Sequence, residues 1–123
     1  MDAEVGVPHI LVIGLDPFRV PGPWDPEPVA AGIQSGIDQF VERGLDAEFC
    51  RFGLDGSDDI DEVVRAALKD RTRDCVVGGG GVRHEVLLLE RVVNLVRRHA
   101  PNAAIAFNSG PADTFEAAAR WMP

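Results

Sequence analysis

The sequence predicts a single three-layer α/β domain built on a four-stranded parallel sheet. Four short apolar segments alternate with four segments of helical periodicity along the whole chain. The 123 residues suit one domain, and 46% of them are apolar, which is enough to form a core. Charged residues make up 26%, a proportion that excludes disordered, collagen-like and disulfide-stapled chains.

The strands are predicted from the apolar segments. His9 to Leu15 contains Ile10 to Ile13 in unbroken succession, which is typical of a central parallel strand covered on both faces. Ala47 to Phe52 carries Glu48 and Arg51 among apolar residues and therefore suits an edge strand. The third and fourth strands are short and apolar, at Cys75 to Gly78 and Ala103 to Phe107.

The first two helices have apolar stripes and recognisable ends. Apolar residues recur at helical spacing from Val29 to Val41, and Gly44 follows where a left-handed cap is wanted. The second helix begins in the acidic segment Ser57 to Glu62 and ends among basic residues, so its charges complement the helix dipole at both ends. Those basic residues are Lys69, Arg71 and Arg73.

The last two helices raise one question about packing. The third helix, from Glu85 to His99, stops before Pro101, and its apolar side chains cover more than one face. The fourth begins at Asp113, which the sequence predicts as an N-cap. The apolar excess of the third helix favours, as one alternative, a homodimer interface.

Right-handed crossovers reduce the usual strand orders to 2-1-3-4, which is a flavodoxin-like sheet. The first and fourth helices would then cover one face of the sheet and the second and third helices the other. In this order the strands of Cys50 and Cys75 are separated by the first strand, too far apart for an undistorted disulfide. Both thiols are predicted to be reduced and buried. The domain spans residues 1–123, with residues 1–8 as a loose N-terminal segment.

The charge balance limits the partners. Twenty acidic and 12 basic residues give a net charge of −8, which repels phosphate backbones and argues against nucleic acid. No apolar segment is long enough to span a bilayer, and the acidic N-terminus is unlike a secretory signal. A cytoplasmic location without a membrane partner is the expectation.

Ligands of open parallel sheets bind at the carboxyl ends of the strands, where the strand order reverses. The segment after the first strand, residues 16–28, holds five prolines and is long for such a connection. It can present Asp16, Arg19 and Trp24 in fixed positions. The alternative is a rigid cover over the strand ends.

A glycine run follows the third strand and precedes the longest helix. Gly79, Gly80 and Gly81 could direct backbone N–H groups at an anion, and Arg83 could clamp it. The run matches neither the dinucleotide-binding fingerprint nor the P-loop, and no cofactor is identified. The alternative is that the glycines only allow backbones to pass closely.

Chemistry at this edge would involve three further positions. Asn108 and Ser109 follow the fourth strand and can point into the same crevice. His84 could serve as a general base, oriented by Asp16 and acting on water or Ser109, although a surface or capping role is the alternative. The spacing of ligand-type residues predicts no metal site.

Three segments of the C-terminal half resemble a set of small bacterial flavodoxin-like α/β proteins that have no assigned activity. These segments are the glycine-rich turn Gly78 to Arg83, the apolar helix Val86 to Arg98, and Phe107 to Asp113. The resemblance implies the fold and no particular reaction. Ser109-Gly110 stands where we associate Thr-Ser with that set.

The sequence therefore predicts binding of a small polar or anionic metabolite at the carboxyl edge of the sheet. Hydrolase- or isomerase-type turnover is left open. The alternative function is a non-catalytic homodimeric structural or interaction protein that uses the apolar third helix.

Overall fold

The computed structural model describes residues 8–122 and contains one parallel sheet with the strand order β2-β1-β3-β4. This confirms the predicted three-layer α/β fold and its 2-1-3-4 order. The expected loose segment over residues 1–8 lies outside the described residues except for Pro8. The strands are β1 (His9–Leu15), β2 (Asp46–Phe52), β3 (Cys75–Gly78) and β4 (Ala104–Phe107).

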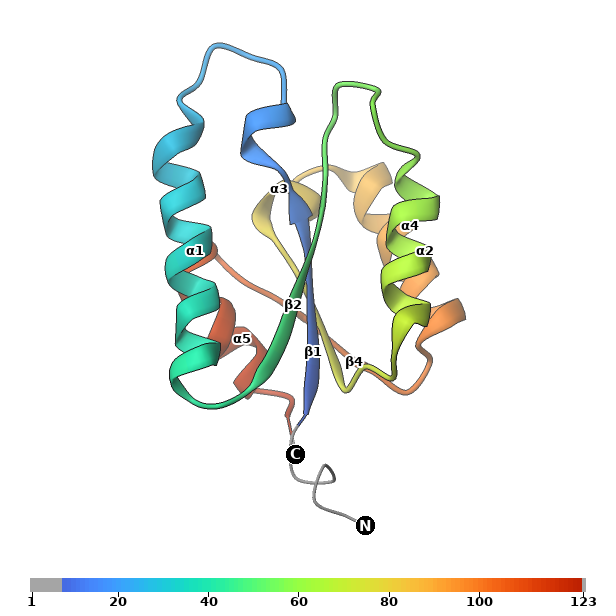
Figure 1. Cartoon of the computed structure of the whole chain (residues 1–123). Helices are drawn as coiled ribbons and strands as arrows, with labels where there is room; N and C mark the ends of the chain where they lie inside the picture. The colour runs from blue at the N-terminus through green and yellow to red at the C-terminus, as the bar shows by residue number, and fades with distance from the viewer. Residues whose placement is uncertain (1–7, 123) are drawn as a thin grey trace.

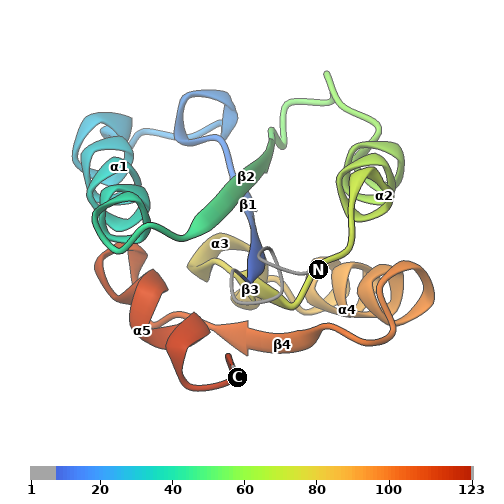
Figure 2. The same ribbon diagram turned by 60° about the horizontal axis from the view of Figure 1, so that its bottom comes forward.

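Helices cover both faces of the sheet (Figures 1 and 2). On one face α1 and α5 pack together, and on the other face α2 and α4 do, as predicted. None of the helices within residues 8–122 is long and apolar enough to cross a membrane. Their bounds are α1 (Pro26–Glu42), α2 (Ile60–Asp70), α3 (Gly80–Arg83), α4 (Val86–His99) and α5 (Thr114–Ala119), with 3-10 turns η2 (Pro17–Arg19) and η3 (Pro111–Asp113).

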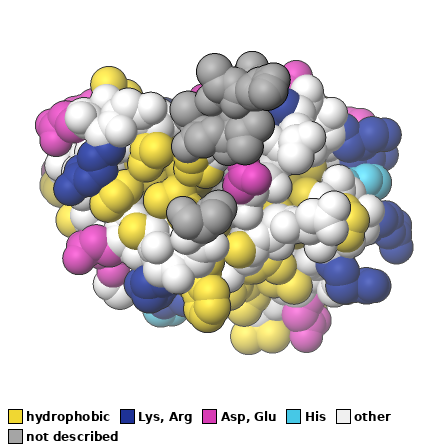
Figure 3. Space-filling model, turned by 90° about the horizontal axis from the view of Figure 1, so that it is seen from below, with side chains coloured by type: hydrophobic (Ala, Val, Ile, Leu, Met, Phe, Trp, Pro, Cys, Tyr) yellow, Lys and Arg dark blue, Asp and Glu magenta, His cyan; other side chains and the backbone are white. Residues whose placement is uncertain are grey.

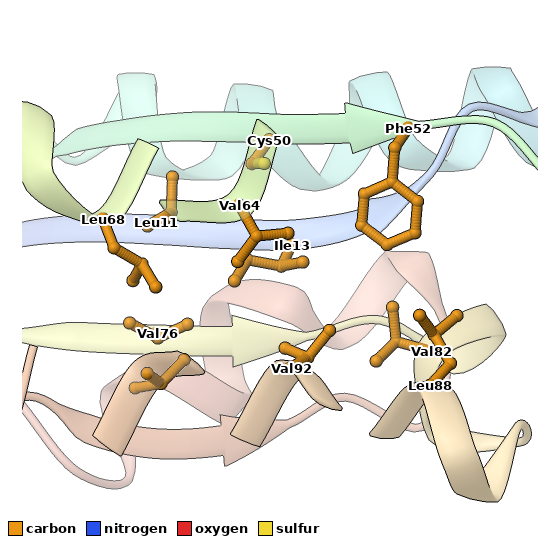
Figure 4. Packing of buried hydrophobic residues seen from close by; sticks show 11 residues of the cluster. Leu11, Ile13, Cys50, Phe52, Val64, Leu68, Val76, Val82, Leu88 and Val92 are labelled. Atoms are coloured by element: carbon orange, nitrogen blue, oxygen red, sulfur yellow. The ribbon is translucent and has the colours of Figure 1, made fainter. Parts of the chain in front are cut away.

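β1 divides the core into two apolar clusters. Its successive side chains point to opposite faces, so Leu11 and Ile13 join one cluster while Ile10 and Val12 join the other. The first cluster lies under α2 and α4 (Figure 4), and the second lies under α1 and α5. Because both faces of β1 are covered, the strand has no polar alternation, which is why the sequence pattern located it.

Both cysteines are reduced and buried, as predicted. Cys50 pairs in register with Ile13 on one edge of β1, and Cys75 pairs with Ile10 on the other edge. Burial raises the pKa of each thiol to about 11, so both remain protonated and unreactive at neutral pH.

The ends of the helices carry the expected charges. Asp59 accepts a hydrogen bond from the backbone N–H of Glu62 and caps α2. Basic residues occupy the last turns of α2 and α4, and Figure 3 shows Lys, Arg and His side chains gathered on the side of the molecule formed by these helices. They complement the negative ends of the two dipoles.

Two local features differ from what the sequence suggests. Asp113 stands at the N-cap position of α5, as predicted, but its carboxylate makes no capping bond to that helix and instead accepts hydrogen bonds from the backbone N–H groups of Ser109 and Gly110. The η3 turn already precedes α5 and points Asp113 back toward its own loop. The glycine-rich turn expected after the third strand contains a single turn of helix, α3, over Gly80–Arg83.

Packing explains why glycines form this turn. Glycine disfavours a helix by about 1 kcal/mol relative to alanine. However, a Cβ at Gly81 would lie 2.5 Å from Leu15 Cδ1 and 2.8 Å from its Cγ, so a larger residue would have to displace the Leu15 side chain from its place beside α3. Val82, in the same turn, is fully buried in the cluster under α2 and α4. Tertiary contacts therefore override the local preference.

A second close approach joins α1 to η3. A Cβ at Gly36 would lie 2.5 Å from the carbonyl oxygen of Pro111, and a Cβ at Gly32 would lie 3.3 Å from the Pro111 ring. The glycines of α1 therefore permit tight packing rather than only weakening the helix. This contact fixes the segment between β4 and α5.

We expect Gly36→Ala to lower the free energy of unfolding by a net value of about 1–2 kcal/mol, because the clash with Pro111 outweighs the gain in helix propensity. Urea unfolding measures this change. The exposed neighbour Ser35→Ala serves as control and should change stability by less than about 0.5 kcal/mol. A neutral or stabilising Gly36→Ala variant would contradict the close approach.

Candidate functional site

A cavity of about 260 Å³ lies between α1 and the carboxyl ends of β1 and β3. The proline-rich segment after β1 and the glycine run after β3 both contribute to its wall, together with the segment after β4. In Figure 1, η2 and α3 both lie near the arrowhead end of β1. The cavity therefore occupies the edge where ligands of open parallel sheets bind.

The wall of the cavity is mostly apolar. Trp24 is the polar side chain that the proline-rich segment contributes to the wall. Its indole N–H donates to the carbonyl of Val20 at 3.0 Å. Asn108 and Thr114 supply the other polar side chains. The apolar side chains of the wall are Val12, Leu15, Pro17, Val20, Val29, Ile33, Ile37, Phe49 and Pro111.

A short chain of hydrogen bonds holds the two polar side chains. The Asn108 side-chain amide donates to Thr114 Oγ1 at 2.9 Å, and the Thr114 hydroxyl donates to the carbonyl of Pro111 at 2.8 Å. Asn108 is 5% exposed and Thr114 6%. Within residues 8–122, Asn108 Oδ1 accepts no hydrogen bond. Asn108 Oδ1 is therefore a buried acceptor without a protein partner in the described chain, and it is covered rather than open to the cavity.

The predicted glycine residues line the cavity but are closely packed. Gly79, Gly80 and Gly81 all contribute to the wall. The backbone N–H of Gly79 already donates to the carbonyl of Ile13 at 2.9 Å. Gly81 lies close to the Leu15 side chain, which is possible because glycine has no side chain. The glycine run therefore lets neighbouring backbone segments pass closely, which is the alternative that the sequence left open. It also forms one side of the cavity.

Arg83 holds a loop in place. Its Nε donates to the carbonyl of Asn108 at 3.0 Å, and one terminal nitrogen donates to the carbonyl of Ser109 at 3.3 Å. The other terminal nitrogen lies 3.3 Å from His84 Nε2. The guanidinium is therefore used to fix the segment after β4, and Arg83 does not line the cavity.

The candidate catalytic side chains lie outside the cavity wall. His84 is exposed between the end of α3 and Glu85. Asp16 caps η2 by accepting the backbone N–H of Phe18 at 3.0 Å. Ser109 is exposed, and its hydroxyl donates to Asp113 at 2.5 Å. The structure brings Trp24, the glycines and Asn108 together at the cavity and leaves these three polar residues around it.

Arg19 ties the proline-rich segment to the loop after β2. Its Nε donates to Asp16 at 3.0 Å, and a terminal nitrogen donates to Asp58 at 2.7 Å. Asp58 in turn accepts the backbone N–H of Gly53 at 2.9 Å. The hydrogen bond from Arg19 is the main cause that lowers the pKa of Asp16. Asp16 and Arg19 therefore position the segment that carries Pro17, Val20 and Trp24 into the wall.

Sequence reasoning did not assign several of the residues in and around the cavity wall to the site. Val29, Ile33 and Ile37 of α1 line the cavity, although their periodicity indicated only a core-facing stripe. Thr114 was not singled out, and Asp58 was read only as part of an acidic helix start. The apolar stripe of α1 could have indicated that this helix lines the site, because the stripe lies beside the edge of the sheet where a ligand was expected.

We expect Asp16→Asn to lower the free energy of unfolding by about 0.5–1 kcal/mol at pH 7, since the partly exposed ion pair is lost. The pKa of Asp16 is lowered in the folded protein, so its stabilising contribution is present above the unfolded pKa of about 3.9. It is lost as the pH falls through the folded pKa. Urea unfolding at pH 7 and at lower pH should show the difference between the two proteins shrinking.

Arg19→Gln provides the matched control for this prediction. It should remove the same pH-dependent contribution, and the double variant should lose less than the sum of the two single losses. Equal effects of Asp16→Asn at neutral and acidic pH, or simple additivity, would refute the ion-pair explanation.

No protein-family model matches the chain, and no curated protein matches it at a significant level. Within residues 8–122, no group of three or more His, Cys, Asp or Glu side chains is arranged to hold a metal ion. The function is therefore inferred from the residues of the cavity.

Proposed function

We propose that the protein binds a small, largely apolar molecule in the cavity at the carboxyl edge of its sheet. The observation that carries this proposal is the apolar wall of a cavity of about 260 Å³ at the reversal of strand order. An apolar cavity of about 150 Å³ is large enough for a benzene ring. The cavity therefore suits one ring with substituents or a compact two-ring molecule.

The wall favours a neutral ligand. Neither a basic nor an acidic side chain belongs to the cavity lining of the described chain. A charged group moved from water into such a wall would lose its hydration without gaining a partner, at a large cost in free energy. The wall therefore favours uncharged, mostly apolar molecules in place of the polar or anionic metabolite expected from the sequence.

The proposal is for binding without a chemical step at His84 or Asp16. Neither residue lines the cavity, and Asp16 is engaged with Arg19 and the backbone of η2. A general base must come within hydrogen-bond reach of the proton that it removes. The position of these two side chains supports roles in the surrounding structure instead.

Indole is a suitable first probe because its two fused rings match the size and apolar character of the cavity. We expect indole to bind the wild-type protein, as measured by calorimetry and by chemical-shift changes of the cavity residues. Ile33→Trp should weaken this binding at least about 10-fold, because the larger side chain fills the space between α1 and the strand ends.

Val41→Trp is the matched control, since Val41 is an exposed residue of the same helix and lies outside the cavity wall. It should bind indole like the wild type. Unfolding curves of both variants establish that they are folded. The proposal fails if the wild type binds no small aromatic probe, or if Ile33→Trp and Val41→Trp bind indole equally well.

The second candidate function is homodimer formation through α4. Most of the apolar excess of this helix is buried within the chain, including Leu88, Val92 and Val96. Val86 and Leu87 at its start, however, are 65% and 77% exposed. These two side chains are the observation that favours an interface on this helix.

If α4 forms a dimer, sedimentation velocity should find the wild type as a dimer and Leu87→Glu as a monomer, because the interface would have to bury a charge. Val41→Glu, on an exposed apolar position of another helix, should leave the dimer intact. A monomeric wild type at the highest accessible concentration would exclude this function.

A further inference from the structure

We propose that two copies of this chain join through the outer edge of β4 and form one continuous sheet, with Ile105 of each copy opposite Ile105 of the other. The two β4 strands would run antiparallel. This proposal goes beyond ligand binding and does not depend on it. It rests on three features of the described chain: the outward backbone groups of β4, the absence of charge from this strand, and the side of α4 that lies beside it.

The backbone of β4 bonds to β3 at every second residue. The N–H of Ala104 donates to the carbonyl of Asp74 at 3.0 Å, within a parallel ladder in which bonding residues alternate. Ile105 and Phe107 therefore direct their N–H and carbonyl groups away from β3. The Arg120 side chain supports this direction, because it donates to the carbonyl of Phe107 at 3.1 Å.

Ile105 is the free position of this edge. Among residues 8–122, no group outside the sheet bonds to its N–H or its carbonyl. A second Ile105 placed alongside in the antiparallel direction can accept from this N–H and donate to this carbonyl at the same time. The same arrangement places the N–H of Phe107 opposite the carbonyl of Ala103 in the second copy. The edge is therefore complementary to itself about a two-fold axis, the commonest symmetry of soluble dimers.

The two edge strands of the sheet differ in charge. The four residues of β4, Ala104–Phe107, are all apolar, and none is proline. β2, at the other edge, carries Asp46, Glu48 and Arg51. Charged side chains on an edge strand oppose pairing with another strand, because pairing would move them out of water. β4 is therefore the edge that suits strand pairing.

One side of α4 lies beside this edge. Arg91 contacts Asp61 of α2 at 3.3 Å, so the side of α4 that carries Arg91 faces α2. Leu89 and Val93 lie on the opposite side of the helix, and both are half-buried. Because α2 contacts β1 and β2, the side of α4 away from α2 is the one nearer to β4 (Figure 2). α4 therefore adds an apolar strip to the outer edge.

Charged side chains border this strip in complementary positions. Glu90 and Arg97 are exposed and lie three and four residues from Val93, on the same side of the helix. Neither forms an ion pair within residues 8–122. A two-fold axis through Ile105 makes the two α4 helices antiparallel neighbours, and Val93 near that axis brings Glu90 of each copy toward Arg97 of the other. This charge complementarity favours a second copy as the partner.

The proposed interface differs from one centred on the exposed Leu87. Leu87 and Arg98 are four and seven residues away from Arg91, so both lie on the side of α4 nearer to α2. A change of charge at either position would therefore stay outside the proposed dimer.

Hydrogen exchange of the full chain tests the strand pairing, with sedimentation velocity to measure how much dimer is present. We expect the amides of Ile105 and Phe107 to exchange at least about 10-fold more slowly at a protein concentration that populates the dimer than at one that does not. The amides of Ala104 and Ala106 bond within the sheet and should be protected at both concentrations.

Charge reversals on α4 test the partner. Glu90→Arg and Arg97→Glu should each weaken the dimer at least about 10-fold in sedimentation velocity, because each places like charges together. The double variant restores opposite charges and should dimerise within about 3-fold of the wild type. Arg98→Glu is the matched control, since it makes the same change at the next residue and should leave the dimer unchanged. Unfolding curves establish that the variants are folded.

The outcomes separate this inference from the functions proposed above. A wild type that stays monomeric at all concentrations leaves the β4 edge to a strand of another protein, which overturns the inference and the dimer candidate but not ligand binding. A dimer that Leu87→Glu dissociates and that both charge reversals leave intact uses another surface of α4, which overturns the inference alone. Amides of Ile105 and Phe107 that stay unprotected in a dimer would also overturn it.

Discussion

The buried strand β1 is the constraint on which the rest of the structure depends. It pairs with β2 along one edge and with β3 along the other, and its two faces supply both apolar clusters. Because all strands are parallel, these pairings bring the segments after β1, β3 and β4 to one edge of the sheet. The cavity is formed where these segments meet α1. A polar residue inside β1 would therefore disturb the core and the site together.

Most polar groups around the cavity hold its wall together. Arg19 links the proline-rich segment to the loop after β2, and Arg83 links α3 to the segment after β4. Two close approaches, of Gly36 to the Pro111 carbonyl and of Gly81 to the Leu15 side chain, bring α1 and α3 against the wall of the cavity. Since the charged side chains are used in these links, the wall of the cavity remains mostly apolar.

The fold could be predicted because its signals are local and repeated. An unbroken apolar run identified β1, and Gly44, with a φ of +68°, ended α1 as expected. The site was predictable only in its position. Asp113 has the local sequence of an N-cap, and the same sequence also permits the bonds to Ser109 and Gly110 that it makes. The apolar stripe of α1 looks the same whether it packs against protein or lines a cavity. Contacts such as Arg19 with Asp58 depend on the tertiary arrangement, which the spacing of residues does not show.

A crystal structure of the protein with bound indole tests the central claim most directly. The account predicts that the ring lies in the cavity between α1 and the strand ends, in contact with Ile33 and the other apolar side chains of the wall. Indole bound only outside the cavity would contradict the account.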